Sequence, residues 1–226
     1  MHLKKYIITI IFIVALFRTQ NVKAIEYPIM FLGGNVGYGQ NDLKSGLAIK
    51  GAFRYSLEAY IPGLQIETSY STTLFQALQD TTIKLDNDDE NIYQTKIGDH
   101  QIGLSALLNL HPFGKSSAVF IGGGGNINFI KADSSWTEKY WDPVAEDFQE
   151  LKHDPVNLLQ EAVPGFHVFG GLRFALGKFG TFDIEVRKTF LNVDESAWKV
   201  DRFRKQYGEK KWDSLNFNVG MTFFIF

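Results

Sequence analysis

The sequence predicts an all-β protein: an eight-stranded antiparallel up-and-down β-barrel that crosses a membrane, with short turns at one end and long loops at the other. Three observations lead to this fold class. Apolar and polar residues alternate through eight segments, most of these segments are long, and short and long connections follow one another in turn. Successive side chains of a strand point to opposite faces, so each segment has one apolar and one polar face.

The first 24 residues have the features of a secretory signal peptide. Lys4 and Lys5 precede an apolar stretch from Tyr6 to Phe17, and Ala24 is a small residue suited to signal peptidase. The apolar stretch is too short for a membrane-spanning helix, which needs about 20 residues. We therefore expect cleavage near Ala24 and a barrel domain over residues 25–226.

The composition argues against several classes of function. The chain has no cysteine, so it is neither a lipoprotein nor a disulfide scaffold, and it has no thiol-ligated metal. Removal of residues 1–24 takes away four of the 23 basic residues, which leaves 19 against 25 acidic ones and a net charge of −6. This mild acidity argues against nucleic acid as a partner. No motif predicts a cofactor or a metal.

Eight segments have the period of a strand, and most reach the length of about 9 to 11 residues that a tilted membrane strand needs. The last segment is the clearest, because alternate residues from Leu215 to Ile225 are apolar. In lipid only a closed barrel satisfies the backbone of strands, so membrane strands predict a barrel. The eight segments are residues 30–39, 46–56, 63–74, 100–111, 117–130, 165–176, 180–190 and 214–226.

The connections favour a membrane barrel over a soluble one. In membrane barrels short turns face the periplasm and long loops face outward. With eight strands, both ends of the barrel domain lie on the periplasmic side. The connections at 57–62, 112–116 and 177–179 are short, those at 75–99, 131–164 and 191–213 are long and charged, and 40–45 is a short outer exception.

The polar faces of the strands would line the lumen of such a barrel. They carry four bases, three acids and one histidine, and this near balance of sign predicts a lumen filled by ion pairs. Eight strands enclose a space that side chains can fill, so we expect no wide pore. The residues of this predicted lumen network are Lys50, Arg54, Glu67, His167, Arg173, Asp183, Glu185 and Arg187.

The whole pattern resembles the small eight-stranded outer-membrane barrels of the OmpA and OmpX kind. The resemblance is carried by the glycine-rich segment Gly33–Gly39, the inward acid Glu67, the glycine run Gly122–Gly125 and the terminal Phe226. It implies a location in the cell outer membrane and a structural, adhesive or surface-binding role. It also implies, as partners, outer-membrane lipid, lipopolysaccharide, the outer-membrane assembly machinery and an extracellular ligand or surface.

In that family the terminal strand carries an assembly signal, which here would comprise Phe226, Phe224 and Gly220. The family's final aromatic usually lies on the lipid-facing phase. In this chain the apolar phase runs through Ile225 and puts Phe226 on the other phase. A slip or bulge near Phe223-Phe224 would restore the usual phase.

The long loops supply candidates for binding. In loop 131–164, Asp142-Pro143 and Asp154-Pro155 predict helix starts, and in loop 191–213 Asp194 predicts the cap of a helix that ends at Gly208. The aromatic residues of the first loop either bind a partner or pack on the rim. The basic residues of the second suit lipopolysaccharide phosphates, pair with the acidic loop 86–90, or are solvated. These binding candidates are Trp136, Tyr140, Trp141, Lys199, Arg202, Arg204 and Lys205.

Two motifs resemble chemical sites without completing them. Gly122–Gly125 lacks the Gly-Lys-Ser/Thr ending of a phosphate loop, and Asp86–Glu90 lacks the later glycine and glutamate of a calcium loop. We therefore predict a protein that is not an enzyme.

One alternative is a lipid-modifying enzyme in which His100 and Ser135 face one another at the outer rim. Another is a soluble, lipocalin-like barrel that binds a small apolar ligand, with its apolar face inside.

Overall fold

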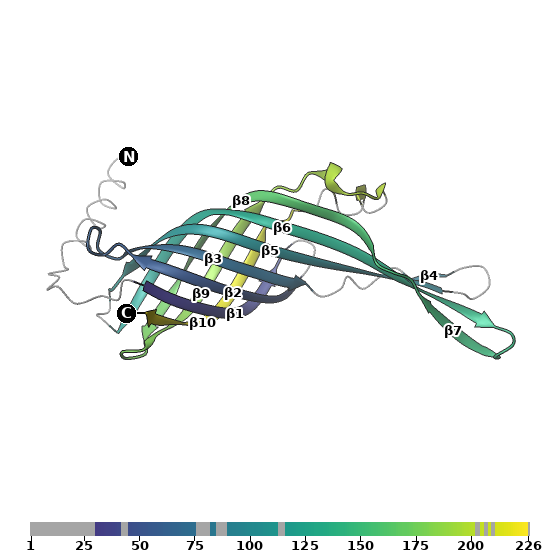
Figure 1. Cartoon of the computed structure of the whole chain (residues 1–226), viewed down its shortest axis with the longest axis horizontal. Coiled ribbons are helices and arrows are strands. Elements are labelled where there is room, and N and C mark those ends of the chain that lie inside the picture. Colours follow the sequence, from purple (N-terminus) through teal and green to yellow (C-terminus); the bar gives the residue numbers. More distant parts are fainter. Residues whose placement is uncertain are drawn as a thin grey trace, which may run out of the picture.

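The computed structural model describes residues 30–41, 45–75, 82–84, 90–112, 116–201, 204–205, 208 and 211–225. In this part of the chain ten antiparallel strands form one sheet, and eight of them close into a barrel in the order β5-β3-β2-β1-β10-β9-β8-β6, with β6 pairing back onto β5 (Figure 1). The elements are β1 (Met30–Gln40), β2 (Ser45–Ser56), β3 (Leu64–Phe75), β4 (Thr82–Lys84), β5 (Glu90–Leu110), β6 (Ser117–Asp142), β7 (Asp147–Lys152), β8 (Val156–Ala175), β9 (Gly180–Leu191), the 3-10 turn η1 (Glu195–Ala197) and β10 (Ser214–Ile225).

The predicted fold class is confirmed, since each of the eight predicted segments is a strand of the barrel. Met30 of β1 pairs with Ile225 of β10 and with Tyr55 of β2, so the start of β1, the end of β10 and the short β2–β3 turn share one end. Gly63 closes that turn with a φ of 77°, a backbone conformation that glycine adopts without strain. We call the opposite end the outer end.

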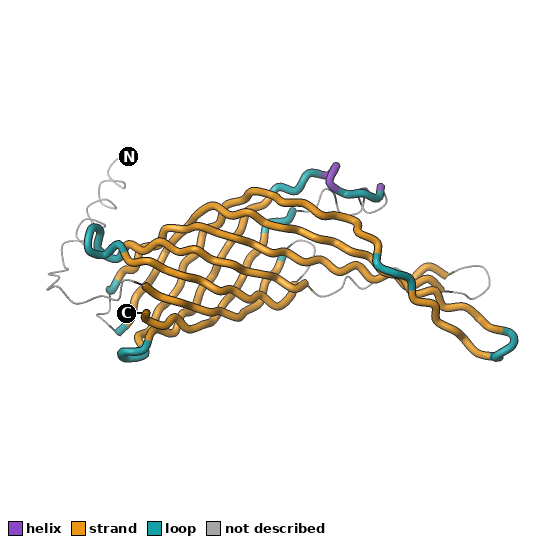
Figure 2. The backbone as a smooth tube through the Cα atoms, in the orientation of Figure 1, coloured by secondary structure: helices purple, strands orange, loops and turns teal. Residues whose placement is uncertain are grey.

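Three strands continue past their predicted limits at the outer end. β5 begins at 90 and not at 100, β6 ends at 142 and not at 130, and β8 begins at 156 and not at 165. β4 and β7 pair with the extended parts of β5 and β6, and together they project as a narrow sheet beyond the barrel (Figure 2). We call the sheet of residues 82–84, 90–97, 131–142 and 147–152 the outer arm.

The predicted helices in loop 131–164 are wrong. Asp142 does accept hydrogen bonds from the backbone N–H groups of Val144 (2.8 Å) and Ala145 (3.3 Å), but it does so in the turn between β6 and β7. An Asp-Pro pair starts a turn as readily as it starts a helix. The second predicted start, Asp154-Pro155, lies in the link between β7 and β8. Cross-strand pairing of Trp141 with Phe148, whose rings meet edge to face at 5.2 Å, favours the hairpin.

The predicted helix from Asp194 to Gly208 forms only in part. Asp194 caps the short turn η1 and accepts a hydrogen bond from the N–H of Ser196 (2.8 Å). The backbone and side-chain hydrogen bonds from Ser196 lower the pKa of Asp194. Helical backbone bonds recur from Arg204 to Val200 (3.0 Å) and from Gly208 to Arg204 (2.7 Å). Among the described residues no helix is long and apolar enough to cross a membrane.

The two faces of the barrel wall have opposite character. Large apolar side chains point outward and are exposed, as at Leu104 (58%) and Ile121 (61%), whereas charged side chains point inward and are buried, as at Glu67 (0%) and Arg187 (1%). A soluble barrel buries its apolar face. The lipocalin-like alternative, which requires the apolar face inside, therefore disagrees with the structure.

Replacing Gly124 by alanine should destabilise the barrel, because a Cβ there would lie 1.9 Å from the carbonyl oxygen of Leu104 in the β5–β6 ladder. We expect a loss of about 2–3 kcal/mol in the free energy of unfolding, measured by urea titration of the protein refolded into lipid vesicles. Gly34→Ala is the matched control, since no atom lies within 4 Å of the added Cβ, and it should keep the wild-type stability within about 1 kcal/mol. Equal losses in both variants would contradict the close approach at Gly124.

Candidate functional site

The interior of the barrel contains a connected network of ion pairs, and Glu67 of β3 is one of its two centres. Its carboxylate lies 2.7 Å from Arg54 Nε, 2.9 Å from Arg187 Nη2 and 3.1 Å from Lys50 Nζ. Glu185 joins the same group, at 2.6 Å from Lys50 Nζ and 3.1 Å from Arg187 Nε. Side chains from β2, β3 and β9 therefore meet across the lumen.

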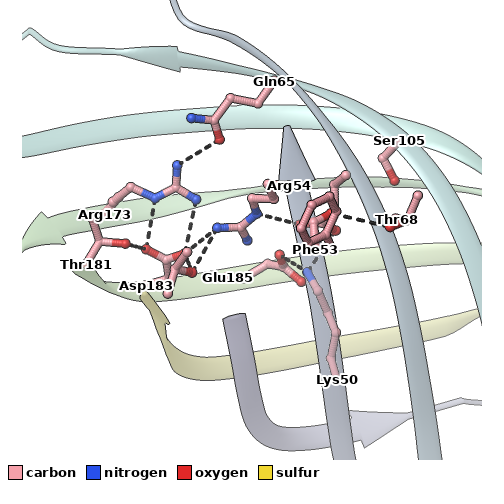
Figure 3. Close-up of polar contacts among 12 residues, drawn as sticks. Lys50, Phe53, Arg54, Gln65, Thr68, Ser105, Arg173, Thr181, Asp183 and Glu185 are labelled. Atoms are coloured by element: carbon pink, nitrogen blue, oxygen red, sulfur yellow. Dashed lines mark hydrogen bonds and ion pairs between the residues drawn. The ribbon is translucent and has the colours of Figure 1, made fainter. Parts of the chain in front are cut away.

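Asp183 of β9 is the second centre. It lies 2.9 Å from Arg54 Nη1 and 2.9 Å from Arg173 Nε, and Figure 3 shows both guanidinium groups pointing toward it. Thr181 and Thr222 also donate hydrogen bonds to this carboxylate, at 2.9 and 3.1 Å. Because Arg54 contacts both Glu67 and Asp183, the two centres form one network.

Four bases and three acids thus share a water-poor interior. Transfer of each charge from water is costly, and the pairs offset that cost only if their geometry and hydrogen bonds are good. The chain provides such bonds through neutral side chains, for example from Arg173 Nη1 to Asn109 Oδ1 at 2.7 Å. Loss of a single charge from this group would leave its partners buried and uncompensated.

Two buried aromatic rings contact the cations of the network, and the sequence interpretation missed them. The ring of Phe169 lies 4.4 Å from Arg187 Cζ and 5.5 Å from Lys50 Nζ, and the ring of Phe120 lies 5.0 Å from Arg173 Cζ. Both phenylalanines are buried with Leu107. Cations over ring faces are stabilised when both are desolvated. The available signal was that both residues occupy the polar phase of their strands.

His167 lies inside with the network, and the side chains that it hydrogen-bonds are neutral. Its Nε2 is 2.7 Å from Ser105 Oγ, and its Nδ1 is 3.5 Å from Asn126 Oδ1. Serine, histidine and asparagine in this order resemble a nucleophile with its base and orienting group. Ser105 and His167 are only 3% and 1% exposed, so a substrate could not reach them.

The alternative enzyme site at the rim is not assembled. Ser135 pairs with Gln94 of β5, six residues from His100 in the same strand, which corresponds to about 20 Å. His100 instead lies beside Tyr70, with 2.8 Å between its Nδ1 and the phenol oxygen. The two residues of the proposed lipid-modifying site therefore do not face one another. In the described part of the chain no group of three potential metal ligands occurs either.

The aromatic binding candidates lie on the outer arm. Trp136 stacks on His153 at 4.5 Å, and Trp141 packs against Phe148, so both tryptophans contact the arm itself. Tyr140 and Trp141 nevertheless remain exposed, at 37% and 46%. Self-packing and an accessible aromatic surface, which the sequence left as alternatives, thus occur together.

The basic candidates lie on the segment that follows β9. Lys199 hydrogen-bonds Asn157 of β8, and Arg204 forms an ion pair with Asp201. Lys205 is exposed, whereas Arg202 and the acidic loop 86–89 lie outside the described residues. Trp198 and Trp212 of the same segment are buried against β5, β6 and β8 in an apolar cluster with Ile97, Ile130, Leu159 and Val163. This cluster was not predicted.

In the terminal strand the pairing with β1 is unbroken from Leu215 to Ile225, so no slip or bulge near Phe223-Phe224 changes the phase of the described residues. Phe224 points inward and packs edge to face on Phe31 at 5.6 Å. A Cβ at Gly220 would lie 2.2 Å from the carbonyl oxygen of Gly34, so this position needs a glycine. Phe226 lies outside the described residues, as does the expected signal peptide.

No protein-family model matches the sequence, and no curated protein matches it. Three similar solved structures have low identity. A major outer membrane protein from Thermus thermophilus has 12% identity and a TM-score of 0.52, and the match covers 86% of this chain and 98% of that one. Neisserial surface protein A (NspA) has 14% identity, a TM-score of 0.49 and coverages of 87% and 96%. Ail of Yersinia pestis, solved with the heparin analogue sucrose octasulfate, has 8% identity, a TM-score of 0.44 and coverages of 86% and 95%. At such identities the similarity concerns the fold, and the chain has the fold of a small eight-stranded outer-membrane β-barrel.

Proposed function

We propose that this chain is an integral protein of the bacterial outer membrane, delivered by a signal peptide cleaved near Ala24, with a structural, adhesive or surface-binding role. One observation carries the proposal: the closed barrel exposes apolar side chains all around its wall and buries its charged ones. Exposure of so large an apolar surface is unfavourable for a monomer in water, whereas it is favourable in the hydrocarbon of a membrane.

The interior supports a closed lumen and not a wide pore. The ion pairs of Glu67 and Asp183 cross the barrel between opposite strands, and the rings of Phe120 and Phe169 fill space beside them. Since none of the seven charged residues is more than 8% exposed, water has little access at this level. The role of this network is thus to plug and brace the barrel.

The outer arm supports the surface-binding role. It projects from the barrel (Figure 1) and displays Tyr140, Trp141 and Phe148 near its tip. Aromatic side chains supply much of the energy at protein interfaces because they offer large area for little conformational entropy. In this proposal the arm contacts an extracellular ligand or surface.

A pair of single-cysteine variants tests the membrane location, because the natural chain contains no cysteine that would also be labelled. Leu104→Cys lies outward and should be labelled quickly by an apolar diazirine photolysed in the membrane of intact vesicles, because its carbene needs no thiolate, and only slowly by a charged aqueous maleimide. Ser69→Cys lies inward on β3, at a position only 7% exposed, and should react with neither. Mass spectrometry of the labelled protein measures both rates. Rapid aqueous labelling at position 104, or recovery of the protein from the soluble periplasm, would refute the membrane location.

Glu67→Gln tests the bracing role of the network. The variant leaves Lys50, Arg54 and Arg187 with one carboxylate fewer, so we expect a loss of about 3–5 kcal/mol in the free energy of unfolding in detergent micelles. Asp133→Asn removes an exposed ion pair with Lys131 and should cost less than about 1 kcal/mol. The bracing role fails if both variants unfold at the wild-type urea concentration.

Replacement of residues 139–150 by a tight Asn-Gly turn tests the role of the arm. The barrel should still fold, seen as a difference in gel migration between unheated and boiled protein, because the arm lies outside the closed sheet. Cells that express this variant should lose the attachment to surfaces that the wild type confers. Attachment equal to that of the wild type would exclude the arm from binding.

A further inference from the structure

A set of outward-facing donors lies where the apolar outer wall ends toward the outer end. Along β5 the outward residues are apolar up to Ile102 and then change to His100, and along β6 they are apolar up to Phe129 and then change to Lys131. Lys96 lies further out on the same face of β5. We call His100, Lys96 and Lys131 the rim donor site.

Tyr70 of β3 fixes the imidazole of His100. The phenol oxygen is 2.8 Å from Nδ1, and the two rings are stacked at 6.2 Å with 19° between their planes. A phenol hydroxyl is a good donor and a bare imidazole nitrogen is a good acceptor, so this contact favours the tautomer of His100 in which Nδ1 accepts a hydrogen bond from the Tyr70 hydroxyl. Nε2 then carries the ring N–H, and this N–H is free to donate to another group.

Gly98 leaves this nitrogen accessible. A Cβ at position 98 would lie 4.0 Å from Nε2 of His100, so the imidazole lies over a stretch of bare backbone. Gly98 is directly paired with Lys131 in the β5–β6 ladder, and Lys131 in turn is paired with the exposed Gln160 of β8. Lys131 is therefore the diagonal neighbour of both His100 and Lys96 across this ladder, at about 7–8 Å, so the three donors share one patch of wall.

The patch retains a positive charge after its own carboxylate is counted. Asp133 lies opposite Lys96 and forms an ion pair of 2.7 Å with Lys131, and Asn157 also donates to Asp133 at 3.0 Å. One carboxylate against two ammonium groups leaves one positive charge beside the imidazole N–H. Lys131 is 55% exposed, and such an exposed pair is weak enough to share its ammonium group with a further anion.

We propose that the rim donor site binds the phosphate of an outer-leaflet lipid. The donors suit a phosphate, and the exposed apolar side chains of Ile102, Ile127 and Phe129 directly below them suit acyl chains. A free phosphate ion would use the donors but not this apolar surface. The inference rests on the proposed membrane location and adds the chemistry of one lipid contact and the residues that make it.

Titration with lipid A carrying two phosphates, followed by native mass spectrometry of the full chain in detergent, tests the site. His100→Phe and Lys131→Met should each weaken binding about 5-fold, since each removes one donor to an anion. Tyr70→Phe should weaken it about 2-fold, because the ring remains while the hydrogen bond that fixes the Nε2 proton is lost. Lipid A without phosphates should bind the wild type as weakly as the variants.

Lys178→Met is the matched control, because Lys178 is an exposed lysine in the turn between β8 and β9 at the opposite end of the barrel. It should bind lipid A as the wild type does. Equal weakening in this control, or no weakening in the His100 and Lys131 variants, would overturn the proposal. So would displacement of the lipid by millimolar inorganic phosphate. These outcomes are separate from the cysteine labelling at position 104, which tests the membrane location itself.

Discussion

Closure of the sheet by the β5–β6 ladder is the constraint on which the other features depend. It satisfies the backbone of all eight barrel strands and divides the side chains into an enclosed set and an outer set. Once the sheet is closed, a charged inward residue is buried, and pairing with another inward residue offsets the cost of that burial. The Glu67 and Asp183 centres are the result, and they join strands that are not neighbours in the sheet.

Closure also explains why the polar interior and the apolar exterior belong together. Charged residues inside alternate in sequence with apolar residues outside, as Asp183, Glu185 and Arg187 alternate with Ile184 and Val186 in β9. A shift of β9 by one residue would expose the acids to lipid and bury the apolar side chains. The ion pairs and the apolar wall therefore specify the same register.

Period two was sufficient to predict the eight strands and to put the charged residues on one face of each strand, because both depend only on local alternation. The alternation of short and long connections was needed to predict that this face points inward. Which base meets which acid depends on how distant strands align around the barrel, and Glu67 and Arg187 are separated by 120 residues. The hairpin at Asp142-Pro143 could not be distinguished from a helix start, since the same residues favour both. Phe120 and Phe169 were missed although both lie on the polar phase of their strands. Nothing in the local sequence distinguishes an aromatic residue that packs inside the lumen from one that contacts a loop.

The outer arm has a consequence for the energetics of recognition. The part of β6 that extends beyond the barrel, residues 131–142, is about 40 Å long as a strand, and hydrogen bonds tie it to β5, β7 and β8 along its length. A loop of equal reach without such pairing would have to lose its conformational freedom upon contact with a ligand. The paired arm loses that freedom during folding, so a partner that meets its tip encounters a preorganised surface, and more of the contact energy is available as affinity.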